Sequence, residues 1–104
     1  MDYPKLFSEL CTDYAGVTGV AVPERGGRSF GSTALKINSK IFAMLVDGRL
    51  VVKLPRARVT ELIETGRAEP FESGRGRPMR EWVTLTCDEA ACRALVVEAQ
   101  AFVG

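Results

Sequence analysis

Two apolar runs separated by Asp47-Gly48 dominate the hydrophobic pattern of this chain. They cover residues 40–46 and 49–54, and Pro55 follows the second run directly. Asp-Gly is a pair that the two-residue type I′ turn favours, because both of its central residues need a positive φ. The pattern therefore predicts a β-hairpin at the centre of the protein.

Apolar residues at helical spacing mark a helix on either side of this hairpin. The first is expected over residues 3–14, with Asp2 as its N-cap and Gly16 beyond its end. The second is expected over residues 55–65, because proline suits the first turn of a helix and Gly66 suits its stop. Both helices need an apolar sheet face to cover.

The rest of the chain contains weaker signals for a loop, one more helix and further strands. Residues 66–80 hold three glycines and two prolines, a composition that predicts a loop. Thr86-x-x-Glu89 matches a capping box, which predicts a third helix with an apolar stripe that runs to Val103. Short β-rich runs predict strands at residues 17–22, 33–37 and 82–85.

These elements predict an α+β fold, in the order α-β-β-β-α-β-α with space for one extra strand. The sheet is expected to be antiparallel, with four to five strands flanked by three helices. A chain of 104 residues with 46% apolar content is large enough for a single core, so we expect one domain over residues 1–104.

The turn before Lys40 decides which side chains share a face of the sheet, since a shift of one residue exchanges the two faces. A two-residue turn at residues 38–39 would place Lys36 opposite Ile41. A three-residue loop ending at Lys40 would instead pair Ile37 with Ile41. We favour the second register, because it gathers these apolar side chains on one face: Leu35, Ile37, Ile41, Ala43, Leu45, Leu50, Val52 and Leu54.

The opposite face would then carry an apolar patch edged with basic residues. Phe42, Met44 and Val51 form the patch, and Lys36 and Lys53 lie at its margins. Soluble monomers seldom expose such a surface without using it. We therefore expect Phe42, Met44 and Val51 to form an interface with a protein partner or with a second copy of this chain.

The balance of charge gives little indication of a nucleic-acid partner. Lys and Arg total 14 and Asp and Glu total 13, so the net charge is +1. Residues 20–55 are more basic, with six bases against two acids and a local charge of +4. The chain shows neither the ~18 consecutive apolar residues of a membrane span nor the basic start of a signal peptide, so we expect a cytoplasmic protein without a membrane partner.

Histidine is absent, which removes the commonest general base and the commonest transition-metal ligand. We therefore expect a protein that is not an enzyme and that holds no cofactor and no metal. The three cysteines, Cys11, Cys87 and Cys92, form no CxxC pair, and their odd number favours reduced thiols over disulfides.

Several short motifs follow one another in a distinctive order between residues 30 and 85. They are Phe30-Gly31, Lys40-x-Phe42-Ala43-Met44-Leu45, Gly48-x-Leu50-Val51-Val52-Lys53-Leu54-Pro55, Arg58-Val59, Pro70-Phe71 and Gly76-Arg77-Pro78-Met79-Arg80-Glu81-Trp82-Val83. In this order and spacing the chain resembles the N-terminal domain of the TfoX/Sxy proteins, to which the MmcQ/YjbR group is related. The resemblance implies a helix-flanked antiparallel sheet, in a family linked to competence regulation and a related group labelled DNA-binding.

The start of the second helix is a candidate anion site. Arg56 and Arg58 lie in its first turn, where free N–H groups and the helix dipole already favour anions, and Lys53 lies just upstream. Of the two arginines we favour Arg58, because it belongs to the family pattern. The alternative is that both arginines lie in solvent or pair with acids such as Glu61.

Arg75-Gly76-Arg77-Pro78 has the core sequence of a minor-groove AT-hook, in which arginines lie along A·T acceptors. Its neighbours include Glu72 and Glu81 instead of more bases, so the same residues also suit a structural turn. Arg80 and Trp82 follow closely. Trp82 would serve as a stacking platform for a base, as an anchor for a protein partner, or as ordinary core packing.

We therefore expect a small non-enzymatic binding or regulatory domain that acts through protein or anion contacts. Two alternatives stay open, a nucleic-acid-binding module and a self-associating homodimer domain. The candidate binding residues are Lys53, Arg58, Arg77, Arg80 and Trp82.

Overall fold

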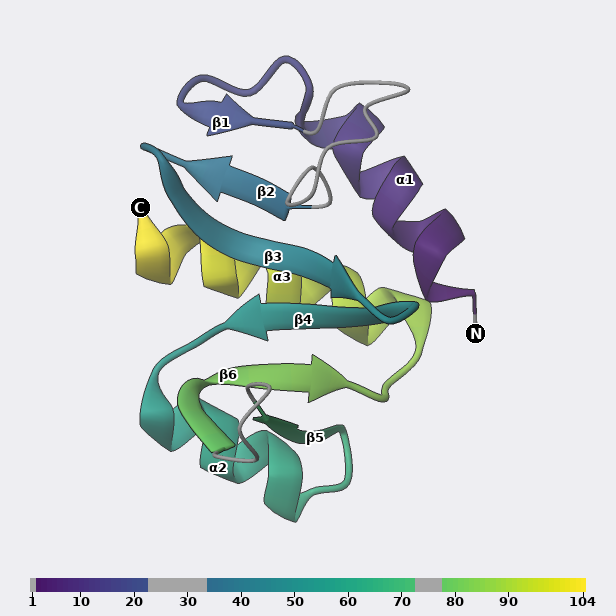
Figure 1. Ribbon diagram of the computed structural model, residues 1–104, viewed down its shortest axis with the longest axis vertical. Helices are drawn as coiled ribbons and strands as arrows, with labels where there is room; N and C mark the ends of the chain where they lie inside the picture. The colour runs from purple at the N-terminus through teal and green to yellow at the C-terminus, as the bar shows by residue number, and fades with distance from the viewer. Residues whose placement is uncertain (1, 23–33, 73–77) are drawn as a thin grey trace.

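The computed structural model of the protein describes residues 2–22, 34–72 and 78–104 (Figure 1). Its elements in chain order are α1 (Tyr3–Tyr14), β1 (Val20–Ala21), β2 (Ala34–Ile37), β3 (Lys40–Val46), β4 (Arg49–Lys53), α2 (Arg56–Glu64), β5 (Ala68–Glu72), β6 (Pro78–Leu85) and α3 (Glu89–Val103). The strands of the described chain form one six-stranded antiparallel sheet in the order β1-β2-β3-β4-β6-β5. The expected α+β class is confirmed, and the sheet has more strands than expected.

The three helices of the described chain pack against one face of the sheet. α1 and α3 contact β3 and β4, while α2 contacts β5 and β6. In Figure 1, α3 passes behind β3 and β4. Tyr14 of α1 meets Phe42 of β3 edge to face, with the ring centroids 5.6 Å apart. Buried residues of every helix join the sheet in a single cluster that includes Leu6, Leu10, Leu62, Leu95, Val52 and Val83.

The central hairpin turns at Asp47-Gly48, as the sequence predicts. Both residues have a positive φ, 50° for Asp47 and 75° for Gly48, which is the conformation of a type I′ turn. A second turn with this conformation lies at the other end of β3. Its central residues, Asn38 and Ser39, have φ values of 50° and 70°.

The turn at residues 38–39 corrects the register that the apolar pattern favours. Ile37 pairs with Lys40, and Lys36 pairs with Ile41, so the turn has two residues and not three. The three-residue loop is wrong because asparagine tolerates the left-handed region better than most residues, which makes the tighter turn accessible here.

A β-bulge between β2 and β3 restores most of the expected core face despite the different turn. The register shifts between Leu35 and Lys36, so Leu35 pairs with Ala43 and one extra residue of β3 is left over. Phe42 and Ala43 are neighbours in sequence, yet both are fully buried in the core cluster. The bulge thus turns Phe42 from the outer face, where strict alternation places it, into the core.

Strand β5 corrects the expectation of a loop over residues 66–80. It lies at the edge of the sheet and pairs with β6, where Pro70 faces Val83. Proline has no N–H to donate, and an edge strand tolerates this because only one of its sides is paired. The last strand is also longer than expected, since it begins at Pro78 and not at Trp82.

The end of α2 follows the glycine signal in the sequence. Gly66 has a φ of 75° and donates a hydrogen bond of 3.2 Å to the carbonyl of Ile63. The N–H of Arg67 donates to the carbonyl of Leu62 at 2.9 Å. These two bonds form a Schellman motif, so the prediction that Gly66 stops the helix is confirmed.

The start of α3 differs from the expected capping box of Thr86 and Glu89. The N-cap is Asp88, whose carboxylate accepts a hydrogen bond of 2.9 Å from the N–H of Ala91. The prediction is wrong because aspartate serves the N-cap position as well as threonine does, and Asp88 lies nearer the apolar stripe. α1 begins as expected, with Asp2 as its N-cap.

Candidate functional site

A cleft of about 290 Å³ lies where α2 meets β5 and β6. Its lining comes partly from α2, with Arg56, Val59, Thr60 and Ile63, and partly from the strands, with Pro70, Arg80 and Trp82. A second hollow of about 270 Å³ is lined by Arg56, Arg80 and Glu81. Arg56 and Arg80 therefore belong to both hollows, with the acid of Glu81 on the second.

Local periodicity explains why these residues share one cleft. On α2, positions 56, 59, 60 and 63 have the i, i+3, i+4, i+7 spacing that places side chains on one side of a helix. On β6, Arg80 and Trp82 are two residues apart, so they lie on the same face of the strand. Pro70 comes from β5, which is the neighbour of β6 in the sheet.

The cleft also borders the start of α2. Pro55 is the N-cap, with φ −56° and ψ 147°, and it makes no side-chain capping hydrogen bond. The N–H groups of the first helical turn have no partner within the helix, and they carry the positive end of its dipole. Arg56 therefore adds its charge to a helix end that already favours an anion.

Arg56 and Arg80 give the cleft its positive charge. Both are exposed, and within the described residues neither guanidinium has an acidic partner. In contrast, Arg49, Arg58 and Arg93 each pair with at least one carboxylate. Guanidinium groups bind carboxylate or phosphate through parallel hydrogen bonds, so two of them beside one cleft suit an anion.

Trp82 gives the cleft an aromatic wall. Its side chain is half-buried, and its strand position pairs with that of Lys53 across β6 and β4. The ammonium group of Lys53 lies 5.6 Å from the centroid of the indole ring, within the range of a cation–π contact. The structure therefore brings together three of the candidate binding residues, Lys53, Arg80 and Trp82.

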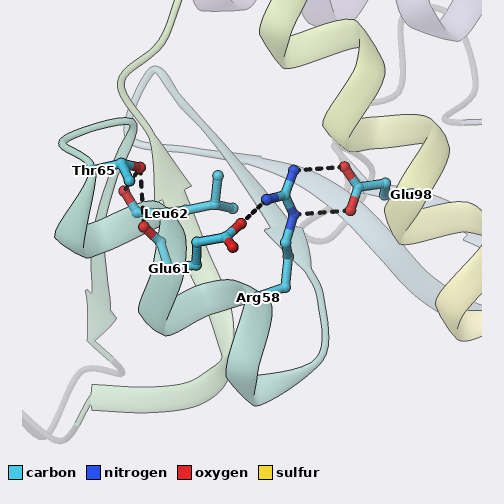
Figure 2. A network of polar contacts seen from close by, with 5 residues as sticks. All are labelled: Arg58, Glu61, Leu62, Thr65 and Glu98. Atoms are coloured by element: carbon cyan, nitrogen blue, oxygen red, sulfur yellow. Dashed lines mark hydrogen bonds and ion pairs between the residues drawn. The ribbon is translucent and has the colours of Figure 1, made fainter.

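Arg58 does not line the cleft, and its side chain points toward Glu98 of α3 (Figure 2). Its Nε and Nη2 each donate a hydrogen bond of 3.0 Å to the carboxylate of Glu98, and its Nη1 contacts Glu61. The hydrogen bonds with Glu98 are the main reason that the pKa of Arg58 rises above its ordinary value. Arg58 thus fits the alternative of pairing with acids, whereas Arg56 lines the cleft.

The last candidate binding residue, Arg77, lies outside the described residues, as does most of the AT-hook sequence around it.

Phe42, Met44 and Val51 do not form the expected exposed patch. Phe42 is fully buried against the helices, and Val51 is 1% exposed. Met44 is half-buried and pairs with Val51. The expected placement of Phe42 and Val51 on an open surface is therefore wrong. For Phe42 the physical reason is the bulge, which the alternation of side chains does not reveal.

Sequence reasoning identifies the polar residues of the cleft better than its apolar ones. Arg80 and Trp82 are candidate binding residues from sequence alone, whereas at the start of α2 the sequence analysis favours Arg58 over Arg56. The helical spacing of Val59 and Ile63 with Arg56 was a usable signal for the α2 side of the cleft. The β5 side of the cleft could not be predicted, because the composition of residues 66–80 indicates a loop.

Two structural properties of the described residues bear on other classes of function. No helix among them is long and apolar enough to cross a membrane. No three acidic or cysteine side chains of the described chain lie together as the ligands of a metal ion would.

Comparisons of the chain with protein-family models, curated proteins and solved structures find no match. The resemblance to the N-terminal domain of the TfoX/Sxy proteins therefore stays a prediction, which rests on the motifs named above.

Proposed function

We propose that this protein is a non-enzymatic binding or regulatory domain that holds an anionic group, attached to an apolar or aromatic part, in the cleft of α2, β5 and β6. The observation that carries the proposal is the position of Arg56 and Arg80, which lack acidic partners in the described chain, beside the indole of Trp82. The anion would contact the two guanidinium groups, and the flat part would lie against Trp82.

The size of the cleft limits what it can hold. At about 290 Å³ it lies just below the ~300–1,000 Å³ that is usual for small-molecule sites. It therefore suits one ring with a single phosphate or carboxylate. A protein partner would present one such group to it, in keeping with action through protein or anion contacts.

The alternative function is binding of nucleic acid. The salt dependence of the affinity distinguishes it from the proposed binding of a single anionic group. A duplex that contacts several basic residues releases counterions, so its affinity falls with a log–log slope of about −0.9 per phosphate neutralised. A single anion in the cleft would show a much shallower dependence.

Phenyl phosphate is a suitable probe, because it joins one ring to one phosphate. Trp82 is the only tryptophan of the chain, so intrinsic fluorescence reports on the cleft directly. We expect a saturable change in fluorescence with phenyl phosphate. Benzyl alcohol, which has the ring without the charge, and inorganic phosphate, which has the charge without the ring, should both bind more weakly.

Variants then assign the contact to the cleft. Arg56→Gln and Arg80→Gln should each lower the affinity for phenyl phosphate by about threefold to tenfold, since each removes a charge-assisted hydrogen bond at an exposed site. Arg67→Gln is the matched control, because Arg67 is also exposed but does not line the cleft. If all three substitutions lowered the affinity equally, the net charge of the protein alone would explain the binding, and the proposed site would be contradicted.

A further inference from the structure

Cys87 and Cys92 bring two thiols into contact at the start of α3. Their Sγ atoms lie 3.5 Å apart, and both cysteines are free. With Asp88 as the N-cap, Cys87 occupies the position before the cap and Cys92 the fourth position of the helix. Side chains at these two positions pack together as a hydrophobic staple. The staple explains why two thiols without a CxxC spacing nevertheless meet.

The two thiols differ in their exposure. Cys92 is fully buried in the core, whereas Cys87 is half-buried. Burial, followed by the contact with Cys87, raises the pKa of Cys92 to about 12, so Cys92 keeps its proton at neutral pH. Solvent and small reagents therefore reach the pair through Cys87, with the protonated thiol of Cys92 behind it.

The surrounding contacts hold this arrangement in place. The carboxylate of Asp88 accepts a hydrogen bond from Ala91 at 2.9 Å, which fixes the first turn of α3 between the two cysteines. The hydroxyl of Tyr3 donates to the carbonyl of Cys87 at 3.3 Å and ties the same segment to α1. Disulfide formation needs the sulfurs to approach from 3.5 Å to about 2.05 Å, a small step for side chains already in contact.

We propose that Cys87 and Cys92 form a reversible dithiol–disulfide site that is oxidised by low-molecular-weight disulfides. Cys87 gives its proton to solvent, and the resulting thiolate attacks one sulfur of the reagent RSSR, forms a mixed disulfide and releases RS⁻, which takes up a proton. The sulfur of Cys92 then attacks Sγ of Cys87 and expels the second RS⁻, which takes up the proton that Cys92 loses. The protein loses two electrons and two protons, and RSSR becomes two RSH.

The test uses oxidised glutathione on the folded protein, followed by alkylation of free thiols, trypsin digestion and mass spectrometry. Cys87 and Cys92 fall in one tryptic peptide, residues 81–93, while Cys11 falls in another. We expect the peptide of residues 81–93 to be lighter by two hydrogen atoms, without glutathione or alkyl groups, and to recover both thiols in dithiothreitol. Cys11 has no nearby thiol partner of this kind, and burial raises its pKa, so it is the internal control.

Two variants assign the steps. Cys92→Ala should retain glutathione on Cys87, because the second thiol is missing. Cys87→Ser keeps the size of the side chain that contacts Cys92 and should leave Cys92 free of glutathione, because solvent does not reach it. The proposal is overturned if the parent peptide keeps both thiols in excess oxidised glutathione, or if it retains glutathione as the Cys92→Ala variant does.

Discussion

The backbone of Ser39 is strained, and this strain lowers the stability of the fold. Its φ of 70° lies in the left-handed region, where a side chain with a Cβ is strained and glycine is not. The equivalent position of the other type I′ turn is occupied by Gly48, with a φ of 75°. The two turns flank β3 and have the same geometry, but only one of them carries the residue that suits it.

Ser39→Gly should therefore stabilise the protein. We expect the free energy of unfolding to rise by about 0.5–1 kcal/mol, because relief of the left-handed strain exceeds the entropy that glycine adds to the unfolded chain. Urea denaturation followed by circular dichroism measures the change. Gly48→Ser is the matched control and should lower the stability by a similar amount. A destabilised Ser39→Gly variant would show that the turn does not have the assigned conformation.

Arg93 connects two elements that are distant in sequence. Its guanidinium, on α3, contacts Glu9 of α1 at 2.7 Å and Asp13 of α1 at 2.8 Å, and Glu89 of its own helix at 3.3 Å. The side chain of Arg93 is 34% exposed, so solvent partly screens these pairs. Arg58 makes the corresponding connection between α2 and α3.

Arg93→Met should loosen the contact between α1 and α3. Methionine keeps an unbranched apolar stem but leaves three carboxylates without their shared cation. We expect a loss of about 1 kcal/mol in the free energy of unfolding at low salt, and a smaller loss at high salt because the interactions are screened. Urea denaturation at two salt concentrations measures this, with Arg67→Met as the control. If the loss of stability does not depend on salt, it comes from packing and not from the ion pairs.

Elements set by local chemistry could be predicted from the sequence, and those set by distant partners could not. The Asp47-Gly48 turn and the stop of α2 at Gly66 depend on φ preferences of single residues, so both predictions are confirmed. The bulge that buries Phe42 depends on how β2 pairs with β3. β5 forms because it pairs with β6 at the edge of the sheet, and the composition of β5 alone does not reveal that pairing.

At the scale of the whole molecule, the arrangement of helices decides which arginine faces the cleft. Arg56 and Arg58 both lie in the first turn of α2, and the sequence favours Arg58 only because it belongs to the family pattern. Glu98 of α3 distinguishes them, because it lies 40 residues away in the chain yet binds Arg58 with two hydrogen bonds. No local pattern predicts that contact. Arg80 and Trp82 could be found from sequence alone, since their residue types suit binding wherever the strand lies.

The most direct test of the proposed function is a map of amide chemical shifts in the ¹⁵N-labelled protein during titration with phenyl phosphate. We expect the largest saturable shifts along residues 56–63 of α2 and at Arg80 and Trp82, with little change at Lys36 and Met44. Benzyl alcohol at the same concentration should leave the amide chemical shifts of the first turn of α2 unchanged. Shifts centred on β2 and β3, or shifts that grow without saturation across the surface, would contradict a binding site in this cleft.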